Sequence, residues 1–168
     1  RAFMLMCDRE GPGKLKLVII GEGPKEYVDQ LKAAVLARGV GARIEFTGRL
    51  SKDGVDEYLA SSLLSVVPSR WYENLPNSVL ESFAVGTPVV ASNIGSLPEM
   101  VISGQTGELF ETGNPEDLTL KLSELTQDHA RLESMGEICK RMVESKYSRK
   151  SHLSKLERLF TSVVSRSR

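Results

Sequence analysis

Residues 15–24 read LKLVIIGEGP, an apolar run that ends abruptly in a turn with two glycines. Such a run is typical of a strand covered on both faces, because both sides of the strand then carry apolar side chains. The apolar residues that follow recur at helical spacing as far as Arg38, and Gly39 is suited to a left-handed helix end. Strand, turn and helix in this order predict one unit of a parallel α/β sheet.

The same alternation continues along the chain. Short apolar segments predict further strands at residues 43–46, 63–67, 88–91 and 108–110, with helices between them. Three more helices are predicted from Pro115 onward. Strands and helices that alternate with right-handed crossovers form a doubly wound parallel sheet, so the predicted fold class is α/β with a helical C-terminal tail.

Length and composition predict a single domain. A chain of 168 residues can bury a sizeable core, which we divide into an α/β core at 1–127 and C-terminal helices at 128–168. No apolar run is long enough to span a membrane. Cys7 and Cys139 have no metal-like spacing, and we expect both to be reduced, buried or idle thiols.

Charge is unevenly distributed, although Lys plus Arg and Asp plus Glu both number 22. This balance argues against a protein that binds nucleic acid through its overall charge. Residues 1–127 carry 12 basic and 17 acidic side chains, whereas residues 128–168 carry 10 basic and 5 acidic ones. Two interpretations of the basic tail stay open: solvated helix faces, or a basic face toward an anionic membrane or an adjoining domain.

The most informative loop is PSRWYENLPN at residues 68–77, which holds the chain's only tryptophan. It follows a predicted strand, and ligands of doubly wound folds bind at the carboxyl ends of the strands. Pro76 suits the first turn of the next helix, where its missing N–H costs nothing. The amides from Leu75 to Ser78 are then unpaired donors at a helix start, which attracts phosphate.

Two carboxylates accompany this predicted anion site. A solvated helix face accounts for Glu81, but less well for Glu73 in an aromatic-rich loop. A ligand with both phosphate and sugar hydroxyl groups accounts for the whole set, because a carboxylate accepts hydrogen bonds from hydroxyls. The turn with Gly21 and Gly23 has two interpretations: it lets a ligand approach the backbone, or it is only a tight connection between strand and helix. It is not a dinucleotide-binding fingerprint, because Glu26 occupies the position of the third glycine.

Several motifs in this order resemble one known family. Glu73 and Glu81 fit an E-x7-E pattern, and this spacing is accompanied by five other segments. The chain resembles, over roughly residues 5–165, the carboxy-terminal domain of GT-B glycosyltransferases of the GT4 type, the glycosyl transferases group 1. The accompanying segments are LVIIGEGP at 17–24, FTG at 46–48, GTPVVAS at 86–92, GSLPE at 95–99 and Gly104-x-x-Gly107.

The resemblance implies a function as well as a fold. It implies a domain that binds a nucleotide-diphosphate sugar, in a longer enzyme whose amino-terminal domain binds a glycan or lipid-linked acceptor. It further implies sugar transfer with retention of the anomeric configuration, without a metal or other cofactor. A cytoplasmic location follows from the same family and from the lack of a signal peptide pattern, with peripheral membrane contact as an option.

The resemblance also assigns roles to individual residues. Glu73 is the expected catalytic residue facing the donor sugar, and Glu81 the expected acceptor of hydrogen bonds from the ribose hydroxyls. The other expected substrate-binding residues are the turn glycines Gly21 and Gly23, the base-pocket residues Gly48, Arg49 and Leu50, the backbone cradle Asn74, Leu75 and Pro76, and the helix start Asn77 and Ser78.

One departure from the family bears on this assignment. The family's domain opens with a strand and a G-R…K-G segment whose Arg and Lys neutralise the diphosphate, and this sequence contains no match to it. Residues 1–10 are instead expected to form the end of the helix that follows that segment, so the central strand is expected to be lacking. Arg49 and Arg70 are candidates to assist with phosphate, but a surface role suits each equally well.

Two other functions stay open at this point. The first is a GT-B sugar-nucleotide epimerase of the UDP-N-acetylglucosamine 2-epimerase kind, which acts on a single substrate. The second is a non-catalytic docking module, which need not keep both Glu73 and Glu81. Nucleophilic catalysis has no support, because Ser69 and Ser92 have no nearby histidine in the sequence.

Overall fold

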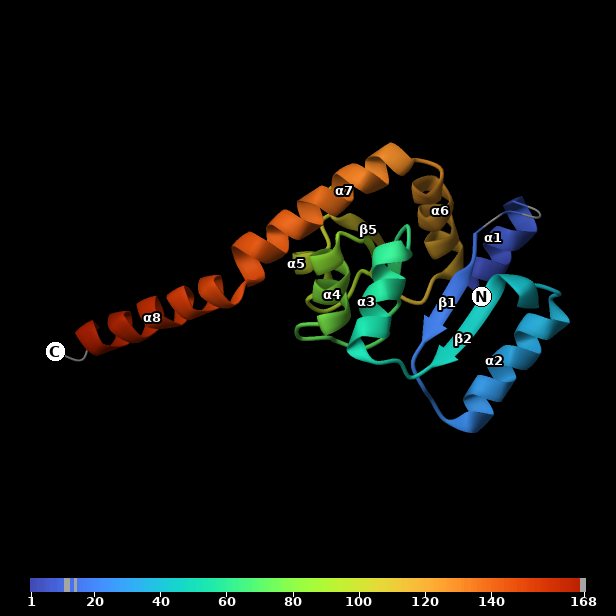
Figure 1. Cartoon of the computed structure of the whole chain (residues 1–168), viewed down its shortest axis with the longest axis horizontal. Helices are drawn as coiled ribbons and strands as arrows, with labels where there is room; N and C mark the ends of the chain where they lie inside the picture. The colour runs from blue at the N-terminus through green and yellow to red at the C-terminus, as the bar shows by residue number, and fades with distance from the viewer. Residues whose placement is uncertain (11–12, 14, 167–168) are drawn as a thin grey trace.

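The computed structural model describes residues 1–10, 13 and 15–166 (Figure 1). A 3-10 turn, Gly41–Arg43, precedes β2, and a π-helical turn, Val143–Tyr147, joins α7 to α8. The helices and strands are α1 (Ala2–Glu10), β1 (Leu17–Ile20), α2 (Lys25–Ala37), β2 (Ile44–Gly48), α3 (Lys52–Ser61), β3 (Ser65–Val67), α4 (Asn77–Val85), β4 (Val89–Ser92), α5 (Leu97–Met100), β5 (Gly107–Phe110), α6 (Pro115–Thr126), α7 (His129–Met142) and α8 (Arg149–Arg166).

All strand pairs among the described residues are parallel, which confirms the predicted α/β class. The strands are divided between two sheets: β1 pairs with β2, and a second sheet has the order β3-β4-β5. Within the part of the chain that the structure describes, β1 and β3 each have one edge without a strand partner. Helix α1 lies where the sequence predicted the end of a helix.

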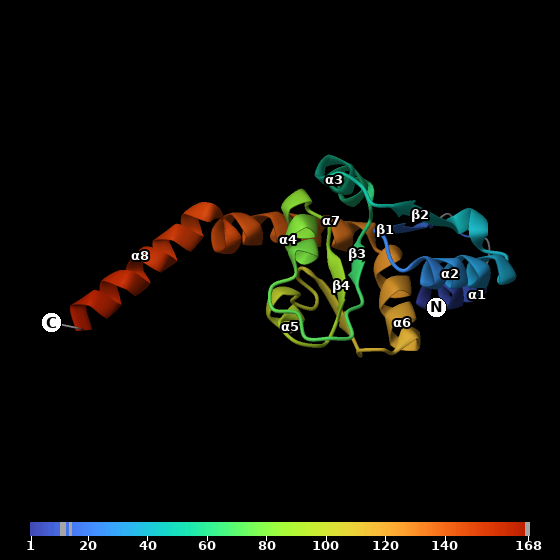
Figure 2. The same ribbon diagram turned by 90° about the horizontal axis from the view of Figure 1, so that it is seen from below.

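The core is built around β4, whose four residues are all fully buried. Val90 packs with α1 and α6 on one face of the sheet, whereas Val89 and Ala91 pack with α4 and α5 on the other. Figure 2 shows α4 and α5 on one side of β3 and β4, and α6 on the other. Alternate side chains of a strand point to opposite faces, so a sheet covered on both faces requires this uninterrupted run of small and apolar residues.

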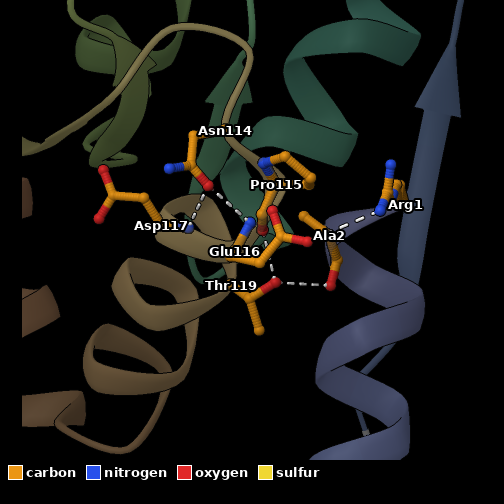
Figure 3. A network of polar contacts seen from close by, with 7 residues as sticks. All are labelled: Arg1, Ala2, Asn114, Pro115, Glu116, Asp117 and Thr119. Atoms are coloured by element: carbon orange, nitrogen blue, oxygen red, sulfur yellow. Dashed lines mark hydrogen bonds and ion pairs between the residues drawn. The ribbon is translucent and has the colours of Figure 1, made fainter.

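The α1–α6 junction fixes the N-terminal helix to the sheet (Figure 3). Asn114 caps α6, because its Oδ1 accepts from the backbone N–H groups of Glu116 and Asp117, both at 3.0 Å. The buried Thr119 hydroxyl lies 2.7 Å from the Pro115 carbonyl and 3.0 Å from the Ala2 carbonyl of α1. This contact and the Arg1–Glu116 ion pair, at 3.7 Å, add polar contacts to an interface whose buried residues are apolar.

Both cysteines are buried. Burial raises the pKa of the Cys139 thiol to about 12, since a thiolate loses hydration in the apolar core. The thiol is therefore neutral at physiological pH and is part of the packing beneath α4 and α5. This agrees with the prediction of buried, reduced thiols.

The C-terminal helix differs from the rest of the fold. Figures 1 and 2 both show α8 extending away from the other elements. Its apolar residues Leu153, Leu159, Phe160, Val163 and Val164 are exposed. No helix within residues 1–10 or 15–166 is long and apolar enough to cross a membrane. The two interpretations of the basic tail both remain predictions.

The junction gives a first prediction. We expect Thr119→Val to lower the free energy of unfolding by about 1 kcal/mol, because the substitution keeps the shape but removes the hydroxyl that bonds to Ala2. Thr126→Val is the matched control, since among the described residues the Thr126 hydroxyl bonds only to the Leu122 carbonyl of its own helix. Urea denaturation of both variants measures the difference, and equal losses would show that the contact with α1 adds nothing.

Candidate functional site

The loops that leave the carboxyl ends of the strands carry most of the predicted site residues. The N–H of Gly21, which follows β1, donates to the carbonyl of Gly48, the last residue of β2, at 2.8 Å, so the ends of the two strands are joined. Gly21 has φ 125° and Gly48 has φ 69°, backbone conformations that favour glycine. A Cβ at either position would meet nothing within 4 Å, so the space in front of both turns is open.

The other predicted residues of these two loops are less constrained. Gly23 has an ordinary φ, and a Cβ there would lie 3.8 Å from Val28. Arg49 is exposed, and its guanidinium has no partner among the described residues. Leu50 is half-buried and lies beside Gly54 in the first turn of α3. The loop therefore presents backbone and an unpaired cation to solvent.

Glu81 on α4 lies near the start of α3. The pKa of Lys52 is raised, chiefly because its ammonium donates to Asp56, and the nearby charge of Glu81 acts in the same direction. Helices α3 and α4 pack against each other. Glu81 has no hydrogen bond or ion pair with another described residue. The fold thus brings the second carboxylate of the E-x7-E pattern toward Lys52 at the start of α3.

The start of α4 has unpaired donors, as the sequence predicted. Pro76 occupies the N-cap position and its side chain makes no capping bond. The Val79 N–H bonds back to the Pro76 carbonyl at 3.1 Å, whereas the N–H groups of Asn77 and Ser78 have no acceptor among the described residues. Such a helix start carries a partial positive charge, and it favours an anion.

The Glu73 carboxylate is held by its own loop. The Trp71 indole Nε1–H donates to Glu73 Oε1 at 2.8 Å, and the Ser69 hydroxyl donates to the same oxygen at 3.2 Å. Among the described residues, Arg70 makes no hydrogen bond or ion pair with Glu73, and its guanidinium lies beside Gly113 instead. Two neutral donors, rather than an arginine, therefore position this carboxylate.

The backbone of Glu73 is held by the β4–α5 loop. The Ser96 hydroxyl and the Ser96 N–H both donate to the Glu73 carbonyl, at 2.9 and 3.3 Å. Gly95 lies so close that a Cβ there would be 3.1 Å from both the N and the O of Glu73. The neighbouring Asn74 and Leu75 side chains are exposed, so this loop offers its backbone and one carboxylate to the space beyond the sheet.

A hollow at the ends of β4 and β5 contains none of the predicted site residues. Its volume is about 510 Å³. The buried hydroxyls of Thr112, which lines the hollow, and of Ser92, which precedes the lining residue Asn93, have no hydrogen-bond partner among the described residues. Across the described ranges, no group of three or more His, Cys, Asp or Glu side chains is placed to hold a metal ion. The hollow is lined by Asn93, Leu109, Phe110, Glu111, Thr112, Asp117 and Lys121.

Comparison with known proteins identifies the family. Residues 2–147 match the family model of the glycosyl transferases group 1. The chain belongs to this family. It is 34% identical over 133 residues to a sulfoquinovosyl transferase of Arabidopsis thaliana, covering 77% of this chain but only 24% of that protein.

Solved structures agree on the fold. The Anabaena protein Alr3699/HepE, solved in complex with UDP, matches with a TM-score of 0.84 at 18% identity, over 96% of this chain and 44% of that one. The C-terminal domain of a glycosyl transferase group 1 protein from Francisella tularensis matches with a TM-score of 0.78 at 22% identity, over 88% of this chain and 76% of that one. The expected fold, a GT-B carboxy-terminal domain, is confirmed.

Sequence reasoning did not assign Ser69, Trp71 or Ser96 to the site. A signal was present, because Ser69, Trp71 and Glu73 alternate in the loop and so can lie on one side of an extended segment. The contact between Ser96 and Glu73 joins two loops that are 23 residues apart, and no local pattern predicts it.

The close approach of Gly95 to Glu73 gives a second prediction. We expect Gly95→Ala to destabilise the protein by more than the roughly 1–2 kcal/mol that a left-handed alanine costs, because its Cβ also presses on the Glu73 backbone. Gly104→Ala is the matched control, since Gly104 has φ 78° and nothing within 4 Å of its Cβ position. Thermal unfolding compares the two, and equal shifts would contradict the role of the close approach.

Proposed function

We propose that this chain is the donor-binding domain of a glycosyltransferase that uses a nucleotide-diphosphate sugar. The observation that carries the proposal is the joint placement of Glu73 and the start of α4 in one β3–α4 segment. Glu73 has one carboxylate oxygen occupied by Trp71 and Ser69 and the other without a partner among the described residues. The unpaired amides of Asn77 and Ser78 follow directly and suit a diphosphate.

The remaining assigned residues complete a path for the donor. The open turns at Gly21 and Gly48 leave room for the nucleoside, with Arg49 and Leu50 beside them. Glu81 accepts from the ribose hydroxyls on the side that faces this loop. The Anabaena protein of the same fold was solved in complex with UDP, which supports a nucleotide as part of the ligand.

The proposed chemistry is transfer with retention of configuration and without a metal. As the bond to the anomeric carbon breaks, charge builds on the leaving diphosphate, and the α4 dipole stabilises it without reorganisation. Glu73 orients the sugar through a hydroxyl group. The acceptor, a glycan or a lipid-linked acceptor, binds to a further domain, which is consistent with a chain that spans 24% of its Arabidopsis relative.

The family match favours a transferase over the epimerase and the docking module. An assay without acceptor separates the first two, because an epimerase acts on its single substrate whereas a transferase requires an acceptor. Because no Arg/Lys pair of the family type is present, the chain by itself is proposed to bind the donor weakly and to transfer no sugar. Location in the cytoplasm, with peripheral membrane contact as an option, is part of the same proposal.

Nucleotide titration tests the proposal and gives a third prediction. We expect UDP, GDP or ADP to shift the amide resonances of Gly48 and Ser78, with weak affinity because each absent charge-assisted contact costs about 1.5–3 kcal/mol.

Glu81→Gln weakens this binding and, in the complete enzyme, raises the donor KM with kcat unchanged, since ribose contacts persist from ground state to transition state. Glu57→Gln, on the exposed side of α3, is the control. No binding of any diphosphate would contradict the proposal.

Glu73 gives a fourth prediction. We expect Glu73→Ala in the complete enzyme to lower kcat by roughly a hundredfold, about 2.7 kcal/mol, because the contact strengthens as positive charge develops beside the sugar hydroxyl. Affinity for the bare diphosphate stays unchanged, because that ligand has no sugar. The exposed Glu124→Ala on α6 is the control. Parallel losses of kcat, diphosphate affinity and melting temperature would show that Glu73 only stabilises the loop.

A further inference from the structure

The two oxygens of the Glu73 carboxylate have different surroundings. Oε1 accepts from both the Trp71 indole and the Ser69 hydroxyl, at 2.8 and 3.2 Å. Oε2 has no hydrogen-bond partner among the described residues. Because an ionised carboxylate only accepts hydrogen bonds, the free oxygen is left to a donor from outside the chain.

Burial in the core does not explain what holds the Trp71 side chain in place. Trp71 is 66% exposed, so its large ring is not held in place by the apolar core. Its indole N–H group can only donate a hydrogen bond, and it donates to Glu73 Oε1. Ser69 is only 8% exposed, so the same carboxylate also satisfies the hydroxyl of a buried residue.

Glu73 is thus fixed at both ends. Ser96 holds its carbonyl with two donors, and Gly95 closes against its backbone. Ser69 and Trp71 hold the far end of its side chain. A glutamate loses more side-chain freedom on ordering than most residues, and here that loss has already occurred in the free protein.

We infer that Trp71 and Ser69 are positioning residues that lock Glu73 Oε1 and thereby present Oε2 to a hydroxyl of the donor sugar. This inference rests on the proposed function and deepens it, because it names the oxygen that contacts the sugar and the groups that aim it. A pre-aimed acceptor needs no reorganisation as charge develops at the anomeric carbon. Trp71 and Ser69 therefore act on turnover through Glu73, without touching the nucleotide.

The contact itself is tested without any activity measurement. The chain has a single tryptophan, so one indole N–H resonance in a ¹H–¹⁵N NMR spectrum reports on Trp71 alone. We expect Glu73→Gln to move this resonance upfield, because a neutral amide oxygen is a weaker acceptor than a carboxylate. Glu99→Gln, an exposed carboxylate in the neighbouring α5, leaves it in place. An unmoved resonance in Glu73→Gln would overturn the inference.

Kinetics of the complete enzyme then test the positioning role. We expect Trp71→Phe to lower kcat about tenfold or more, the range of one hydrogen bond to a charged group, while KM and the affinity for the bare diphosphate change less than about twofold. We expect Ser69→Ala to lower kcat as well. The control is Tyr72→Phe, since Tyr72 is 83% exposed and its hydroxyl makes no hydrogen bond to Glu73 among the described residues.

The outcomes separate this inference from the proposed function. Transfer and diphosphate binding in the wild-type enzyme, together with an unchanged kcat in Trp71→Phe, would overturn the positioning role alone. Equal losses of kcat, diphosphate affinity and melting temperature in Trp71→Phe would overturn it as well, since they indicate a purely structural role. Absence of both transfer and diphosphate binding in the wild-type enzyme would overturn the proposed function and this inference with it.

Discussion

The arrangement of the molecule depends on β4, which is paired on both edges and covered on both faces. A strand in this position has no freedom to shift its register, because a shift by one residue would exchange its Val90 face with its Val89 and Ala91 face. The loop that follows β4 therefore leaves the sheet at a fixed place. Ser96 and Gly95 in that loop carry this constraint to Glu73 in the loop after β3.

The proposed site combines a rigid carboxylate with incomplete helix and turn ends. Glu73 is held by donors from two loops, whereas the amides of Asn77 and Ser78 have no acceptor among the described residues, and the turns at Gly21 and Gly48 leave open space beside them. Ordered acceptors beside unsatisfied donors suit a ligand that has both hydroxyl groups and a diphosphate. The match to the glycosyl transferases group 1 family supports this proposal for the ligand.

Strand positions were predictable because each strand is a short apolar run that ends at a turn. The predicted strand bounds differ from the observed ones by no more than two residues at any end. Pro76 at the start of α4 was predictable for a similar reason, since its fixed φ suits a helix start and its missing N–H is not needed there. The division into two sheets was not visible in local patterns, because pairing depends on which edges meet in space.

The sequence by itself determined the α/β class and the strand–loop–helix units, because these follow from local periodicity. It also predicted the two glutamates of the proposed site, from their spacing within one segment. Only the tertiary structure decided that Glu73 is anchored by Ser96, that Gly21 bonds to Gly48, and that Glu81 lies toward Lys52. Each of these contacts joins residues that are far apart in the chain. Their formation depends on the packing of whole helices and strands, and no local sequence pattern records that packing.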